Sequence, residues 1–163
     1  MEPSLSIPAV CRRIIQKQMA DLQKQSFVNE VGSVSGNIYQ WHATLLGPPN
    51  NPFVGEKFVL NIHFHSDHPL KPPMVRFQTN IFHPNISPSS GGISMRIMRQ
   101  YWVPHISMLK LLDSIRLMLI EPNLEEAHPD VADTAEIYKN DKAMYESTAQ
   151  SWSQLYAMEE NAQ

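Results

Sequence analysis

Near the start of the chain, apolar residues recur at the spacing of an α-helix. A single stripe of such a helix would carry Cys11, Ile14, Ile15, Met19 and Leu22. We therefore predict a helix from about Ile7 to Lys24, with Ser6 as its N-cap and Pro8 in the first turn. Basic residues lie off the stripe, as on a solvated face: Arg12, Arg13 and Lys17.

Strict alternation of apolar and polar residues predicts two strands further on. The first has apolar Tyr39, Trp41, Ala43 and Leu45 between polar Gln40, His42 and Thr44. The second has Phe58, Leu60, Ile62 and Phe64 on its apolar face. Residues 26–33 and 74–77 are weaker candidates, and the proline-rich residues 47–52 form a turn. Because the connections are short, we expect a four-stranded antiparallel meander.

In the second half of the chain, apolar spacing and capping residues predict three helices. Ser107 caps the first, Met108 to Ile120, whose apolar residues cover most of its circumference, so it should be buried across the open face of the sheet. Pro129 starts the second, with Val131, Ala135 and Tyr138 inward. Asp141 caps the last, which carries Tyr145, Ala149, Trp152 and Tyr156 on one side. This order predicts an α+β sandwich, and we expect residues 1–163 to form a single domain.

Composition narrows the classes of function. The 163 residues are 42% hydrophobic and carry a net charge of −3, so we expect no general attraction to nucleic acid or to an anionic membrane. No apolar run is long enough to span a bilayer, and the first residues lack the pattern of a signal peptide. One cysteine, Cys11, excludes an internal disulfide and favours a reducing compartment, cytoplasmic or nuclear.

Between the strands and the later helices, residues 83–104 show neither the helical nor the strand spacing of apolar residues. Prolines and glycines interrupt this stretch, and apolar residues recur in it: Ile86, Ile93, Ile97 and Trp102. A disordered segment is poor in such apolar anchors. Long irregular segments in small domains are usually functional when they are ordered, so we predict a functional loop pinned to the core.

The motifs in this loop are His83-Pro84-Asn85, Gly91-Gly92-Ile93-Ser94, Ile97-Met98 and Trp102-Val103-Pro104. Together they resemble the active-site signature of ubiquitin-conjugating enzymes. The resemblance extends over roughly Ala9 to Met158 and includes Gly47-Pro48, residues 68–73 and Pro122-Asn123. It implies the ubiquitin-conjugating fold: an N-terminal helix, four antiparallel strands, an active-site loop, a crossing helix and two C-terminal helices.

The chain departs from this family at the centre of the signature. Ser94 stands where the family has its nucleophilic cysteine, and Arg96 stands where Asp is frequent. The loop after Asn85 is one residue longer than the common form, and Ala127 stands where proline is common. A cysteine is partly thiolate at neutral pH, whereas a serine hydroxyl needs an adjacent base. His83 and His105 are the nearest candidates, and neither has a family precedent as a base.

The resemblance implies roles for three further residues. Asn85 matches the asparagine that stabilises the oxyanion or orders the loop, and both roles remain open. Glu126 matches an acid that orients or deprotonates the incoming lysine, although the sequence alone favours an exposed glutamate beside Glu125. His83 matches a histidine that forms hydrogen bonds within the loop, and we expect that structural role here.

Partner contacts are also implied by the resemblance. Ubiquitin or a ubiquitin-like protein, an activating enzyme and RING-type or related ligases bind this family. The positions that match the partner-binding surface are Arg12, Arg13, Leu70, Lys71, Val103 and Pro104. We expect no cofactor in this chain, because ATP and magnesium serve the activating enzyme.

A metal site is conceivable at His63, His65 and His68, since the first two would share a face of a strand. No cysteine completes the set, and only Asp67 is a nearby carboxylate, so ordinary surface residues are favoured. Cys11 lies on an apolar stripe and is expected to be a small core residue. We predict no metal site.

Three functions fit the sequence. The one we favour is a variant without the nucleophile that acts by binding ubiquitin, activating enzyme, ligase or a catalytically active conjugating enzyme. The alternative is an active ubiquitin-conjugating enzyme, transferring ubiquitin or a relative to lysine through a thioester, in which Ser94 replaces the catalytic cysteine. An unrelated interaction module is disfavoured by the number of motifs in family order.

Overall fold

The computed structural model describes residues 7–159, and the side chains of residues 9–157. Helix α1 runs over Ile7–Gln23, as the apolar stripe predicts, and buries Cys11, Ile15 and Leu22 in the core. The predicted cap Ser6 lies outside the described residues. Arg12 and Arg13 are exposed on the other side of the helix.

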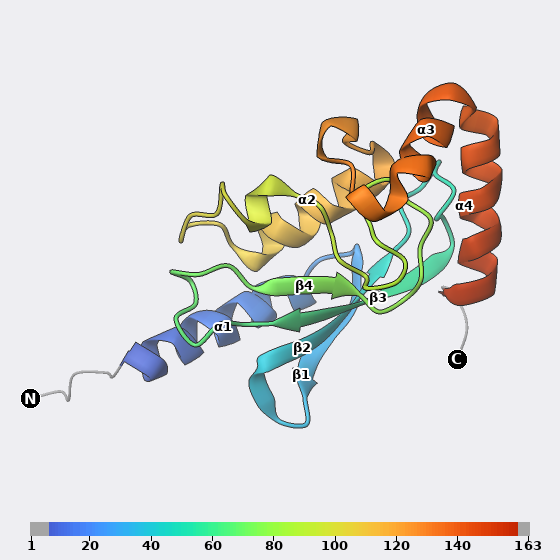
Figure 1. Cartoon of the computed structure of the whole chain (residues 1–163). Helices are drawn as coiled ribbons and strands as arrows, with labels where there is room; N and C mark the ends of the chain where they lie inside the picture. The colour runs from blue at the N-terminus through green and yellow to red at the C-terminus, as the bar shows by residue number, and fades with distance from the viewer. Residues whose placement is uncertain (1–6, 160–163) are drawn as a thin grey trace, which may run out of the picture.

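The sheet is an antiparallel meander in the order β1-β2-β3-β4 (Figure 1). The strands are β1 Val28–Val34, β2 Asn37–Leu46, β3 Glu56–His63 and β4 Met74–Phe77. A two-residue strand that the sequence did not predict, β5 Met158–Glu159, pairs with the start of β3 at Glu56 and Lys57. The four predicted strands are confirmed, with bounds shifted by at most two residues.

One face of the sheet is buried, and the helix α2, Met108–Ile120, contributes to the same core. The strands bury Trp41, Ala43, Leu45, Phe58, Leu60 and Ile62. From α2 come Met108, Leu111, Leu112, Ile115, Met118 and Leu119. Ser107 caps α2 as predicted, because its hydroxyl oxygen accepts a hydrogen bond from the backbone nitrogen of Lys110 at 3.0 Å.

Two expectations about burial are wrong. The last turns of α2 are not enclosed, since Leu117 is 48% exposed and Ile120 is exposed as well. Thr44, expected on the polar face of its strand, is buried. The open end of α2 borders the irregular loop of residues 83–104, since Leu117 lines a hollow with Asn85 and Ser94.

The chain ends in two helices at one end of the molecule (Figure 1). They are α3, Ala132–Asn140, which follows a short turn at Pro129–Val131, and α4, Lys142–Tyr156. Asp141 caps α4 through Met144, as predicted, and Tyr145 and Ala149 are buried. Tyr156, expected on the same side as Trp152, is exposed, and its ring contacts that of Trp152 at 5.6 Å between ring centroids.

Candidate functional site

The loop after β4 is a compact, hydrogen-bonded unit. The backbone nitrogen of Ser94 donates to the carbonyl of Asn85 at 2.8 Å, and that of Ser87 donates to Gly92 at 2.9 Å. Gly91 has a φ of 72°. A Cβ atom there would lie 2.0 Å from the carbonyl oxygen of Phe77, so only glycine fits. The loop is thereby fixed against β4, and Ser94 has a defined position.

His83 is fully buried beneath this loop. Its Nδ1 accepts a hydrogen bond from the backbone nitrogen of Asn85 at 3.0 Å, so its Nε2 carries the proton and donates to the carbonyl of Met118 at 2.8 Å. Burial lowers the pKa of this imidazole to about 4, which keeps it neutral at pH 7. Both ring nitrogens are occupied, so His83 offers no lone pair to the Ser94 hydroxyl.

Asn85 joins the loop to the segment after α2. Its amide nitrogen donates to the carbonyls of Asn123 at 2.8 Å and Glu126 at 3.0 Å. Its amide oxygen accepts from the backbone nitrogen of Asn123 at 3.0 Å. Since both amide hydrogens are used, this geometry favours the loop-ordering role over the oxyanion role that the sequence left open.

Ser94 is 7% exposed, and its hydroxyl oxygen accepts a hydrogen bond from the guanidinium of Arg99 at 3.3 Å. Among the described residues, neither a histidine nor a carboxylate forms a hydrogen bond with this hydroxyl. His105, the second base considered from sequence, is exposed and does not line the hollows next to Ser94. The hydroxyl therefore has a cationic neighbour and no base to take its proton.

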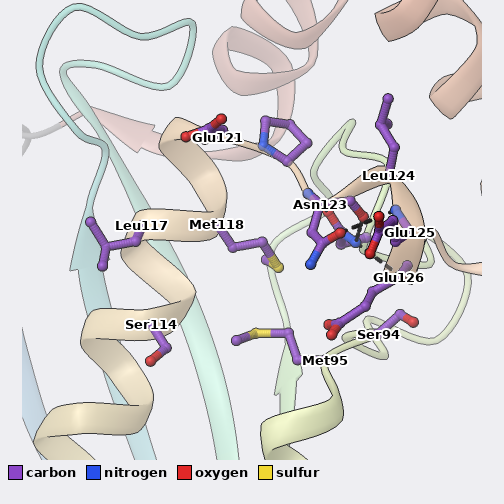
Figure 2. Close-up of a pocket in the computed structure, with 12 residues that line it drawn as sticks. Ser94, Met95, Ser114, Leu117, Met118, Glu121, Asn123, Leu124, Glu125 and Glu126 are labelled. Carbon is purple, nitrogen blue, oxygen red and sulfur yellow. Dashed lines mark hydrogen bonds between the residues drawn. The ribbon is translucent and has the colours of Figure 1, made fainter.

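Glu126 lies in a 3₁₀ turn, Leu124–Glu126, and its side chain lies beside Ser94 (Figure 2). The expectation that it would be an exposed glutamate is wrong, because its side chain is only 18% exposed. One carboxylate oxygen accepts from the backbone nitrogen of Arg96 at 3.2 Å, and the other lies 3.8 Å from the Nε of Arg96. The arginine that departs from the family pattern thus holds the acid beside the reactive position.

A hollow of about 510 Å³ opens between the loop, α2 and the Leu124–Glu126 turn (Figure 2). Ser94, Met95 and Glu126 form one side, while Ser114 and Leu117 of α2 form the other. The site thus has room for a chain segment between Ser94 and the exposed end of α2.

Comparison with known proteins identifies this architecture. The family model for the ubiquitin-conjugating enzyme matches residues 13–153. The chain belongs to the ubiquitin-conjugating enzyme family. The E2 domain of a Toxoplasma gondii ubiquitin conjugating enzyme is 32% identical, with a TM-score of 0.80 over 88% of this chain and 96% of that one. A Plasmodium yoelii protein assigned to the same enzymes is 27% identical, with a TM-score of 0.84 over 97% and 99%.

The residues that match the family's partner-binding positions lie on the surface. Arg12, Arg13, Lys71 and Pro104 are exposed, Leu70 is 71% exposed and Val103 is 46% exposed. The indole nitrogen of Trp102 donates to the carbonyl of Pro69 at 2.9 Å and ties the two loops together. An apolar hollow of about 230 Å³ separates Leu70 from α1 and is lined in part by Cys11, which is buried as expected.

The three histidines considered as metal ligands are in different surroundings. β3 ends at His63, so His65 lies beyond the strand and the expected shared face is wrong. His68 is buried between the rings of Phe64 and Trp102. Within residues 9–157, no three His, Cys, Asp or Glu side chains are grouped to hold a metal ion. No helix described here has the length and apolar character needed to cross a membrane.

Proposed function

We propose that this member of the ubiquitin-conjugating enzyme family acts by reversible binding and does not carry ubiquitin as a thioester. The observation that supports this is the environment of Ser94, whose hydroxyl contacts Arg99 and, among the residues that the structure describes, no base. A hydroxyl that keeps its proton is a very weak nucleophile at neutral pH. Glu126 matches the acid of the family pattern, and its carboxylate is engaged by the backbone and the guanidinium of Arg96.

The partners we propose are those of the family: ubiquitin or a ubiquitin-like protein, an activating enzyme, a RING-type or related ligase, or an active conjugating enzyme. Exposed Leu70 and Val103 support a ligase-binding surface, since their loops are joined through Trp102 and Pro69. Small exposed apolar groups of this kind serve as binding hot spots. NMR titration with a panel of RING domains tests this, because shifts should cluster at Leu70 and Pro104 for at least one of them.

The alternative is an active enzyme in which Ser94 replaces the catalytic cysteine. It is favoured by the ordered backbone around Ser94, which the loop hydrogen bonds hold in place. Under this alternative, Glu126 would have to leave Arg96 before it could assist a lysine.

A charging assay separates the two. The unmodified chain is incubated with activating enzyme, ubiquitin, ATP and magnesium, and it should form no adduct that a reducing thiol cleaves. Ser94→Cys in a Cys11→Ser background supplies a thiolate at the only possible cysteine.

We expect this variant to be charged very slowly or not at all under conditions in which a control conjugating enzyme is charged. The reason is that Arg96 and the longer loop also alter the site, so restoring the sulfur atom at position 94 is not sufficient. Rapid charging would overturn the proposal in favour of the active-enzyme alternative. A base-labile ester on Ser94 in the unmodified chain would do the same.

A further inference from the structure

The longer loop of this chain carries three serines, and they differ in exposure. Ser87 is buried, and its hydroxyl donates to the carboxylate of Asp130 at 2.9 Å. Ser89 and Ser90 are exposed in a turn, which is closed by a hydrogen bond of 2.7 Å from the backbone nitrogen of Gly91 to the carbonyl of Ser87. The turn thus presents two serine hydroxyls at the surface.

Two N–H donors lie close to the Ser90 hydroxyl. Its oxygen accepts a hydrogen bond from the backbone nitrogen of Gly92 at 3.1 Å. A Cβ atom built on Gly92 would lie 3.1 Å from this oxygen and 3.8 Å from the Nε2 of His128, so hydroxyl and imidazole flank the same small space. The Nδ1 of His128 accepts from the backbone nitrogen of Asp130 at 3.1 Å, which places the ring proton on Nε2. Among the residues that the structure describes, this Nε2 donor has no hydrogen-bond partner.

A guanidinium group lies beside the same turn. Arg76 of β4 pairs with Gly92 through an isolated antiparallel bridge, and its side chain lines one hollow together with Ser90. Within residues 9–157, no carboxylate forms an ion pair with Arg76. The other charged or titratable side chains of this hollow are Arg96, Arg99, Glu125, Glu126 and His128. Arginines outnumber carboxylates there, so Ser90 has cationic surroundings.

We propose that Ser90 is a phosphorylation site, whose phosphate is held by Arg76, by the Nε2 of His128 and by the backbone nitrogen of Gly92. A serine kinase transfers the γ-phosphoryl group of ATP to the hydroxyl. The bond from the Ser90 oxygen to phosphorus forms, the bond to ADP breaks, and the hydroxyl proton passes to the catalytic base of the kinase. The product has a charge of about −1.5 to −2 at pH 7 and three strong acceptor oxygens. A guanidinium binds phosphate through two parallel hydrogen bonds, and the two N–H donors supply further ones.

The modification changes the surface next to Ser94 without any change at Ser94 itself. A phosphate bound to Arg76 joins the longer loop to β4, so the folded loop gains a contact that the unmodified chain lacks. It also replaces the positive charge of this surface by a negative one. The inference goes beyond the proposed function and does not depend on it, because Ser90 is the same residue whether Ser94 is inert or carries ubiquitin.

The test prepares the full chain with phosphoserine at position 90 or at position 89. Ser89 is the matched control, because it is exposed in the same turn but does not line the hollow with Arg76. Phosphorus NMR follows the second ionisation of each phosphate, whose pKa is about 6 without partners. This pKa should be about half a unit lower in the folded chain than in urea at position 90, and not lowered at position 89. The midpoint of thermal unfolding should be about 2–4 °C higher with the phosphate at position 90.

Variants locate the contact. Arg76→Gln should raise the phosphate pKa at position 90 most of the way back to its value in urea, and should leave position 89 unchanged. Lys139→Gln on α3 removes the same charge outside the hollow and should change neither phosphate. Thermal unfolding shows whether each variant is folded, and the comparison of positions 90 and 89 decides even if Arg76→Gln is not.

A panel of serine kinases with ATP tests the modification itself, and peptide mapping by mass spectrometry should find phosphate on Ser90 of the folded chain. The proposal is overturned if no kinase modifies Ser90, if the phosphates at positions 90 and 89 titrate alike, or if folded Arg76→Gln leaves the lowered pKa in place. Inorganic phosphate that shifts the signals of Arg76 and Gly92 while the two phosphoserines titrate alike would show a site for a free anion and also overturn it. None of these measurements uses an activating enzyme. A Ser94 adduct in the charging assay would therefore refute the proposed function and leave this inference standing.

Discussion

The start and the middle of the active-site loop, residues 83–104, differ in how their polar groups are used. At His83 and Asn85, every side-chain donor and acceptor group has a partner. The partners belong to α2, to the segment after it and, for the Nδ1 of His83, to the backbone of Asn85 itself. At Ser94, the hydroxyl has one contact, to an arginine. The shape of the loop thus does not depend on the side chain of Ser94. A chain can keep the architecture of a conjugating enzyme while the chemistry at its centre changes.

Replacing Gly91, which fixes the loop against β4, should have the largest effect on stability. Gly91→Ala places a methyl group in collision with the Phe77 carbonyl at a positive φ, so we expect a loss of about 4 kcal/mol in the free energy of unfolding. Gly92→Ala is the matched control, because the nearest atom to its new Cβ is the Ser90 hydroxyl at 3.1 Å. Urea unfolding measures both, and equal losses would contradict the fixed position of the loop.

Removing the side-chain amide of Asn85 and the hydroxyl of Ser94 in turn tests which part of the loop stabilises it. Asn85→Ala leaves the backbone groups of Asn123 and Glu126 without their buried partner, and we expect a loss of about 3 kcal/mol. Ser94→Ala removes one contact with an exposed arginine and should change the free energy of unfolding by less than about 1 kcal/mol. If the two variants unfold at the same urea concentration, the loop is not held mainly at its Asn85 end.

Protonation of His83 offers a reversible way to disturb the start of the loop. Burial lowers its pKa to about 4, so between about pH 6.5 and pH 4 the unfolded chain binds the proton more tightly than the folded chain does. Stability should therefore be constant above pH 6.5 and fall below it, by about 2 kcal/mol from this group at pH 5. His68, whose pKa burial also lowers to about 4, adds a similar fall.

Unfolding at pH 7 and pH 5 measures the effect. His83→Gln should lose part of the pH dependence, whereas His42→Gln, at an exposed position of β2, should retain all of it. A stability that rises between pH 7 and pH 5, or the same slope in His83→Gln, would contradict the buried neutral imidazole.

The sequence predicts the elements of the fold because each carries many periodic residues, as the stripe of α1 and the alternation in β2 and β3 do. It misses β5, because two residues give no period. It does not show that Tyr156 is exposed, because a stripe does not reveal where the surface beneath a helix ends.

The site is predicted less completely than the fold. Resemblance brings Ser94 and Asn85 to one loop, but Asn85 contacts Asn123, 38 residues away, and only the structure shows that its amide is fully used. The sequence does not show that Arg99 contacts Ser94, since this contact depends on the turn at Arg96–Met98. The one available hint was that a positive residue stands five positions after Ser94.

The smallest expected effect concerns Arg99, which contacts Ser94 in the middle of the loop. In Ser94→Cys with Cys11→Ser, the sulfur takes the place of a hydroxyl oxygen 3.3 Å from the Arg99 guanidinium. A nearby cation favours the thiolate, so this cysteine should have a lowered pKa. Arg99→Gln in that background should raise the pKa by about one unit, equivalent to about 1.4 kcal/mol. The pH dependence of alkylation by iodoacetamide measures the shift, and Lys139→Gln should produce none. If Arg99→Gln leaves the alkylation profile in place, Arg99 does not act on the atom at position 94. The surroundings of position 94 would then not be cationic.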